Sequence, residues 1–224
     1  DASLAIGSDP ANHEAYKCRG FCKRMLGDLR GEIHDYKESI IAKPYSSDSD
    51  LLHRCAIIES ELHNYQEAID YYSRAIQLDP ENASLYNNRG LLKVKLKDSQ
   101  SAMNDYTSAI QIDPNHADSY VSRGRLREKH LENIGAIDDY TKAIELQPSN
   151  KIAYAKRGFL KSRLNDHQGA ITDYTKALEI DPNDPDIYFK RGNAKSRLGD
   201  DKGATEDHNK SNEINLNYPK DMSM

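Results

Sequence analysis

Residues 106–114, Tyr-Thr-Ser-Ala-Ile-Gln-Ile-Asp-Pro, return with few changes as Tyr-Thr-Lys-Ala-Leu-Glu-Ile-Asp-Pro at residues 174–182. The prolines that close these phrases belong to a series with a spacing of 34 residues, formed by Pro80, Pro114, Pro148 and Pro182. Pro10 and Pro44 are separated by the same interval, and only the step from Pro44 to Pro80 is longer, by two residues. A fixed period of this length is typical of stacked supersecondary units, because each unit buries its apolar face only against its neighbours.

The unit between residues 82 and 114 indicates how one repeat folds. Apolar residues recur on one face in its first half and again in its second half, with a polar turn at residues 97–100 between them. The pattern predicts two short antiparallel helices, the second of which ends before Pro114, since a residue that precedes proline disfavours the α conformation. Gly90 lies in the middle of the first helix, where glycine costs up to about 1 kcal/mol relative to alanine. We expect a close approach of the second helix at Ala102 to compensate.

An arginine precedes this glycine in five of the repeats, and an aspartate follows the arginine 16 residues later. The pairs are Arg19 and Asp35, Arg89 and Asp105, Arg123 and Asp139, Arg157 and Asp173, and Arg191 and Asp207. The second repeat has Cys55 and Tyr71 instead, so it lacks both partners together, while its Arg54 and Asp70 keep the same separation one residue earlier. This joint loss predicts an ion pair between the two helices of a repeat. A ladder of arginines that binds anions is the alternative.

The repeated residues resemble the tetratricopeptide repeat, a helix–turn–helix of 34 residues with an aromatic residue, a glycine four residues on, and then alanine, aromatic, alanine and proline. The resemblance covers almost the whole chain, but the leading aromatic residue is tyrosine instead of tryptophan and arginine replaces leucine before the glycine. It implies an all-α fold, a right-handed superhelical solenoid of six stacked helix-turn-helix repeats. The prolines predict the end of a preceding repeat at 1–10, repeats at 11–44, 45–80, 81–114, 115–148, 149–182 and 183–216, and a tail at 217–224.

The two ends of the chain depart from the pattern in different ways. Residues 4–10 match the last turns of a second helix, which indicates that the sequence starts inside a preceding repeat of a longer protein. In the last repeat, His208, Ser211 and Asn212 replace an aromatic residue, an alanine and an isoleucine. A polar outer face is what a capping helix needs for solubility, so we expect the second helix of this repeat to cap the stack.

The composition argues against several classes of function. The net charge of −5 disfavours a general nucleic-acid binder, and no segment approaches the roughly 18 consecutive apolar residues of a membrane span. Cys18, Cys22 and Cys55 have no further ligands in a metal-binding spacing, so we expect half-buried free thiols and a reducing, cytoplasmic compartment. The eight histidines are scattered, and we expect His130 to be half-buried with a structural role. We therefore predict no catalytic residues, no metal and no cofactor.

In the family that the chain resembles, the first helices line a concave groove that binds a peptide or a segment of a partner protein. Transferred by position, the candidate binding residues are Phe21, Met25, Ile57, Asn87, Leu91, Arg125, Lys129, Phe159, Arg163, Phe189, Asn193 and Arg197. Exposed aromatic and arginine side chains are frequent hot spots, although Phe159 and Phe189 would contribute less if they pack between helices. Basic residues dominate the set in the last three repeats, which favours an acidic, partly apolar partner segment.

These observations predict a non-catalytic scaffold for protein–protein interactions. One alternative is an assembly subunit that forms oligomers through its repeat faces. The other is a targeting or regulatory arm of a larger protein.

Overall fold

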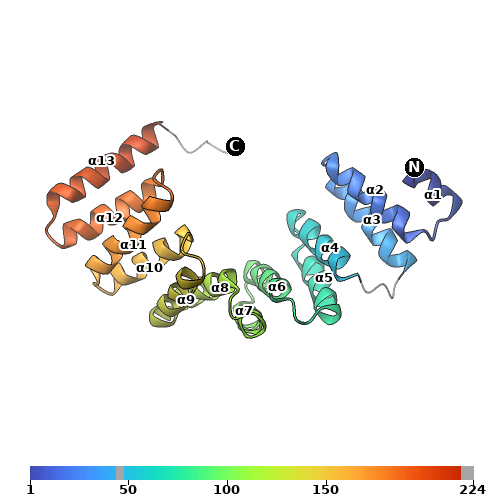
Figure 1. Ribbon diagram of the computed structural model, residues 1–224, viewed down its shortest axis with the longest axis horizontal. Helices are drawn as coiled ribbons and strands as arrows, with labels where there is room; N and C mark the ends of the chain where they lie inside the picture. The colour runs from blue at the N-terminus through green and yellow to red at the C-terminus, as the bar shows by residue number, and fades with distance from the viewer. Residues whose placement is uncertain (44–47, 218–224) are drawn as a thin grey trace. The chain divides into compact units, whose positions relative to one another are not determined.

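The computed structural model describes residues 1–43 and 48–217, and these residues form thirteen helices and no strand (Figure 1). The helices are α1 (Ala2–Ser8), α2 (His13–Met25), α3 (Leu29–Ala42), α4 (Ser49–Glu61), α5 (Tyr65–Leu78), α6 (Ala83–Lys95), α7 (Ser99–Ile112), α8 (Ala117–Lys129), α9 (Asn133–Leu146), α10 (Lys151–Arg163), α11 (His167–Ile180), α12 (Pro185–Arg197) and α13 (Asp201–Asn217). The all-α repeat fold is thereby confirmed. Most of the predicted tail and the end of the first predicted repeat lie outside the described residues.

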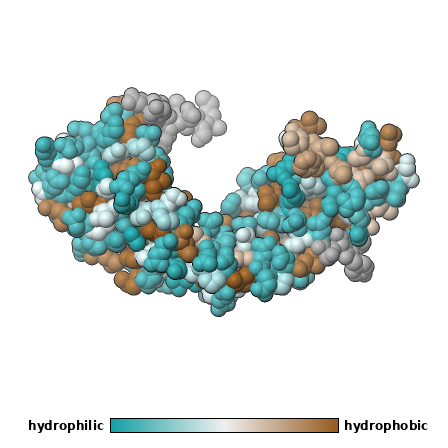
Figure 2. All heavy atoms as spheres, in the orientation of Figure 1, coloured by the Kyte–Doolittle hydropathy of each residue, from teal (hydrophilic) through white to brown (hydrophobic). Residues whose placement is uncertain are grey.

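The chain folds as two compact units, an N-terminal unit (Asp1–Pro114) and a C-terminal unit (Asn115–Met224). Within each unit the helices pair in chain order, α2 with α3, α4 with α5, α6 with α7, α8 with α9, α10 with α11 and α12 with α13. The second helix of a pair also contacts the first helix of the next pair within the same unit, for example α5 with α6 and α11 with α12. On the face drawn in Figure 2, hydrophobic residues form separate patches on a mainly hydrophilic surface. The apolar residues are therefore buried mainly between neighbouring helices.

The turn between the two helices of a pair has the same backbone conformation in each repeat. One residue in this turn has a positive φ, for example Lys97 at 66° and Gly199 at 80°. An aspartate then caps the second helix in most repeats, as Asp98 does by accepting a hydrogen bond from the Ser101 amide over 3.1 Å. His130 is the last residue before such a turn and is exposed, so the expectation of a half-buried histidine was wrong. The reason is its position, since Leu26 and Leu198 at the same place are also exposed.

The mid-helix glycine allows a close approach of the paired helix, but not through the alanine that the sequence suggested. A Cβ atom at Gly90 would lie 2.6 Å from Cε1 of Tyr106, whose ring is almost completely buried. The corresponding glycines meet Tyr36, Tyr140, Tyr174 or His208 in the same way. The predicted close approach of the second helix is thus present, but the atoms nearest Gly90 belong to the tyrosine ring and not to Ala102; at Gly192 the backbone oxygen of Ala204 also lies 3.1 Å from the added Cβ atom.

Gly90→Ala is expected to destabilise the protein by about 1–3 kcal/mol, the usual cost of overpacking a rigid core. Urea unfolding should measure the loss. Gly7→Ala is the matched control, since a Cβ atom there has no neighbour within 4 Å. Equal stability of the two variants would contradict the role assigned to the buried tyrosine ring.

Candidate functional site

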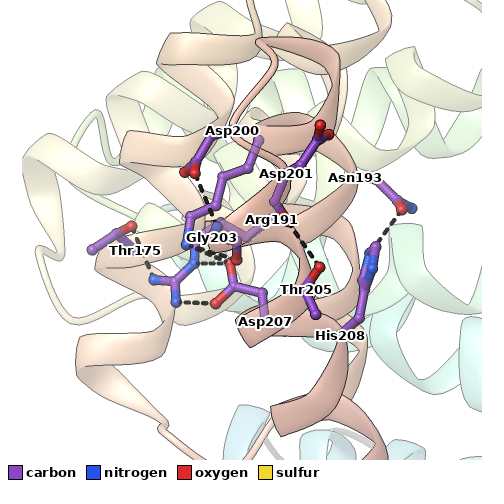
Figure 3. Close-up of polar contacts among 10 residues, drawn as sticks. Thr175, Arg191, Asn193, Asp200, Asp201, Gly203, Thr205, Asp207 and His208 are labelled. Atoms are coloured by element: carbon purple, nitrogen blue, oxygen red, sulfur yellow. Dashed lines mark hydrogen bonds and ion pairs between the residues drawn. The ribbon is translucent and has the colours of Figure 1, made fainter.

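The arginines that precede the glycines are all held by buried aspartates of the paired helix. Arg123 donates from Nε and Nη2 to the two carboxylate oxygens of Asp139 over 3.1 and 2.8 Å. A second cation one turn later, Arg127, donates to the same carboxylate over 2.9 Å. Arg19, Arg89, Arg157 and Arg191 pair with Asp35, Asp105, Asp173 and Asp207 in the same way, and Figure 3 shows the last of these pairs.

The other faces of these guanidinium groups are also occupied. The carbon Cζ of Arg123 lies 5.7 Å from the centre of the Tyr120 ring. In three repeats the remaining Nη1 donates to a hydroxyl of the preceding helix pair, as Arg191 does to Thr175 over 3.1 Å (Figure 3). Because two donors of each of these arginines are already bound to a buried aspartate, the geometry supports the structural role over the anion-binding ladder.

The second repeat replaces this arrangement with a different ion pair. Cys55 is buried where the arginine would lie, and Glu59 stands where the other repeats have the second cation. Lys37 of the preceding pair lies 2.7 Å from Glu59. Arg54 and Asp70, which keep the 16-residue separation, do not replace this pair, since Asp70 accepts a hydrogen bond from Gln66 and Arg54 is exposed.

Arg123→Ala is expected to lower the free energy of unfolding by about 3 kcal/mol, because it leaves the buried Asp139 with one cation instead of two. Lys129→Ala, on the exposed face of the same helix, should change it by less than about 0.5 kcal/mol. Thermal unfolding of both variants measures the difference. Similar melting temperatures would show that the arginine is not a structural residue.

The buried aspartates also make stability depend on pH. Burial alone would raise the pKa of Asp207, but hydrogen bonds from Arg191 and Lys195 outweigh it and hold this pKa below its usual range. A carboxyl group with a lowered pKa contributes stability above about pH 3.9, the ordinary value, and loses it as the pH falls through the pKa of the folded state. Asp207→Asn should therefore be less stable than the wild type at pH 7. Urea unfolding at pH 7 and pH 3 should show this gap shrinking, and a constant gap would contradict the assignment.

The candidate binding residues of the N-terminal unit lie mostly on the surface. Phe21, Met25, Ile57 and Leu91 are exposed, as expected for residues that could contact a partner. Asn87 is buried in the packing of α6, at 5% exposure, and its amide oxygen has no hydrogen-bond partner among the described residues. Asn87 is therefore not exposed as its neighbours in the set are, and its contact with a partner stays a prediction.

In the C-terminal unit, Arg125, Lys129, Arg163, Asn193 and Arg197 are exposed.

The two phenylalanines of this unit differ. Phe159 is half-buried against a core that includes Val121 and Leu160. Phe189 is 53% exposed, and its ring centre lies 5.2 Å from that of His208, whose Nε2 is 3.1 Å from the side-chain oxygen of Asn193 (Figure 3). Phe159 therefore packs partly between helices, whereas Phe189 is accessible to a partner.

A cavity of about 360 Å³ brings several of these candidates together. We call it the arginine cavity; it is lined by Phe159, Ser162, Arg163, Asn165, His167, Asn193 and Arg197. No carboxylate is among these residues, and neither Arg163 nor Arg197 forms an ion pair within the described part of the chain. The Arg163 guanidinium instead lies 5.7 Å from the centre of the Phe159 ring. An apolar ring beside two unpaired cations can accept an anionic group attached to an apolar one.

A second cavity of about 380 Å³ is also lined by Phe159 and differs in charge. Its Lys151 contacts Asp181 and Asp184 at 2.7 and 3.1 Å, and its Lys156 contacts Glu128 at 3.2 Å. Both of these lysines thus have carboxylate partners within the protein, while Lys190, which also lines this cavity, is exposed. Of the two cavities, only the arginine cavity is lined by guanidinium groups.

Sequence reasoning missed Ser162, Asn165 and His167, which complete the arginine cavity. They come from the end of α10, the following turn and the start of α11, and not from the periodic positions of the first helices. Asn165 has a φ of 64°, so the turn conformation places it. Periodicity carries no signal for such turn residues.

Other expectations concern cysteines, metals and membranes. Cys18 and Cys22 are exposed and not half-buried, whereas Cys55 is buried. In the described ranges, no three His, Cys, Asp or Glu side chains are grouped so that they could hold a metal ion. Among these residues, no helix has the length and apolar character to span a membrane.

Comparison with known families agrees with this geometry. A family model described as tetratricopeptide repeat matches residues 57–127, and a second, described as TPR repeat, matches residues 162–199. The chain is a tetratricopeptide-repeat protein. Tetratricopeptide-repeat proteins are generally non-catalytic interaction modules, so the family suggests a role in protein–protein interaction.

Several solved tetratricopeptide-repeat structures are similar to this chain. The crystal structure of MamA protein is 25% identical, with a TM-score of 0.68 over 76% of this chain and 92% of that one. YrrB, described as a TPR protein with an unusual peptide-binding site, is 18% identical, with a TM-score of 0.67 over 82% and 93%. For pilF of Pseudomonas aeruginosa the identity is 17%, with a TM-score of 0.75 over 96% and 95%. Comparison with curated proteins gives no match.

Proposed function

We propose that this tetratricopeptide-repeat protein is a non-catalytic scaffold that binds an acidic, partly apolar segment of a partner protein at the arginine cavity. The observation that carries the proposal is the pair of unpaired guanidinium groups, Arg163 and Arg197, around a cavity without a carboxylate. Arg157 and Arg191 of the same unit are held by buried aspartates, whereas Arg163 and Arg197 remain available to an external anion.

The aromatic side chains supply the apolar part of the interaction. Phe159 lines the cavity and Phe189 is exposed on the next first helix, α12. Arginine and large aromatic residues are enriched among the few side chains that contribute most binding energy. Opposite charge on the partner would raise the association rate, and salt screens this attraction, so binding should weaken as salt is added.

Two further observations support this reading. The similar fold of YrrB has a peptide-binding site according to its description, which shows that such a fold can hold a peptide. Free cysteines, two of them exposed, fit a reducing environment, and we place the proposed interaction in the cytoplasm.

A fluorescence titration tests the proposal. The probe is a labelled octapeptide with four Asp or Glu residues around one Leu and one Phe, compared with the same peptide carrying Asn and Gln. The acidic peptide should bind at least ten-fold more tightly than the neutral one. Arg163→Glu should abolish most of this preference, and Phe159→Ala should weaken both peptides, because the first residue supplies charge and the second supplies apolar contact.

Lys202→Glu is the matched control, since it makes the same charge reversal on the exposed surface of α13, outside the cavity. It should leave the affinity within two-fold of the wild type. If Arg163→Glu and Lys202→Glu weaken binding equally, the arginine cavity is not the binding site. Unchanged affinity in Phe159→Ala and Arg163→Glu would refute the proposal.

A further inference from the structure

The N-terminal unit contains a buried carboxylate that has no counterpart in the other repeats. Glu32 occupies a position at which the remaining repeats have an alanine, namely Ala68, Ala102, Ala136, Ala170 and Ala204. Its side chain is almost completely buried, at 1% exposure, and the oxygen Oε2 has no hydrogen-bond partner among the described residues. An unpaired carboxylate oxygen in the interior is costly, so its presence calls for a partner.

Glu32 lines a cavity of about 410 Å³ between α2, α3 and α4, which we call the Glu32 cavity. Leu29, Ile57 and Ile58 give the cavity an apolar lining. His53 also lines it, and the His53 nitrogen Nε2 is a second buried atom without a partner among the described residues. Burial lowers the pKa of His53, so its imidazole is neutral at pH 7 and can accept a hydrogen bond.

The exposed charges around this cavity balance one another. Arg24 and Arg54 contribute two positive charges, and Asp50 and Glu61 contribute two negative ones. With Glu32 ionised, the lining of the cavity therefore carries one net negative charge. Burial raises its pKa, while a hydrogen bond from Tyr36 and the charges of Arg24 and Arg54 oppose this rise, and a cation bound nearby would oppose it further.

A second, larger cavity of about 640 Å³ adjoins the first. It is lined by Phe21, Leu51 and Cys22 among others, and it shares Asp50 and Arg54 with the Glu32 cavity. An apolar side chain would fit there, next to the charged one. Such a pair of adjacent sites suits a peptide segment better than an isolated small molecule.

We infer that the Glu32 cavity binds an arginine side chain of a partner protein. The planar guanidinium carries five N–H donors, which suit an interior that offers two acceptors without partners, and its aliphatic stem suits Leu29, Ile57 and Ile58. This site lies in the other unit from the arginine cavity and selects the opposite charge. It therefore does not depend on the function proposed above.

An NMR titration of the full chain tests the inference. The probe is N-acetyl-L-arginine amide, and N-acetyl-L-citrulline amide serves as a neutral comparison of nearly the same shape. Arginine should cause saturable shifts at the backbone amides of residues 29–33 and 53–58, with an affinity at least ten-fold higher than that of citrulline. N-acetyl-L-lysine amide should fall between them, since it has the charge without the planar set of donors.

Glu32→Ala should abolish the preference for arginine over citrulline. The substitution is compatible with folding, because alanine is the residue of the other five repeats at this position. Glu32→Gln, which keeps the shape and removes the charge, should do the same, whereas Glu81→Gln, an exposed site between α5 and α6, should retain the preference.

Arg163→Glu separates the two sites and should leave arginine binding unchanged. Equal affinity for arginine and citrulline would overturn the inference and would indicate a cavity filled only by water. Arginine shifts that persist in Glu32→Ala, or that occur away from residues 29–33 and 53–58, would also overturn it.

Discussion

The fold depends on a buried aspartate that is held by two cations one helical turn apart. In five repeats this carboxylate lies on the second helix and both cations lie on the first, at Nη2–oxygen distances of 2.7 or 2.8 Å for the arginine. A buried charge without its partner is strongly unfavourable, so the two helices are held in one register. Where the arginine also reaches a hydroxyl of the preceding pair, as from Arg89 to Ser73, the same residue fixes neighbouring pairs relative to each other.

The second repeat shows how this constraint can be altered without losing the fold. In this repeat the buried carboxylate belongs to Glu59, on the first helix of the pair. Its cation is Lys37, on the second helix of the preceding pair. The ion pair then joins two repeats and not the two helices of one. The neighbouring positions change as well, since Ala56 replaces the glycine and Glu32 replaces an alanine. The departures thus gather around α3 and α4, where the Glu32 cavity lies.

The fold and the main ion pairs could be predicted from the sequence, because the residues that form them repeat with a fixed period. The joint absence of arginine and aspartate at Cys55 and Tyr71 was sufficient to predict the pairing that the structure has. Other features could not be predicted. Periodicity tells which face a residue lies on but not how far its side chain reaches, so Tyr106 and not Ala102 meets Gly90. It also says nothing of turn residues such as Asn165 or of how deeply Asn87 is buried.

A repeat protein separates structural from functional residues by whether they recur. The aspartates, their arginines and the buried tyrosines recur, and their hydrogen-bonding groups are used within the chain. Several side chains that line the two cavities do not recur, since Glu32 replaces an alanine and Phe159 lies where the preceding repeat has Arg125, whereas Arg163 returns as Arg197 in the next repeat. Because each unit keeps its register through the recurring residues, single substitutions at the other positions can change charge without disturbing the helices. The opposite charge preferences that we propose for the two units are compatible with that freedom.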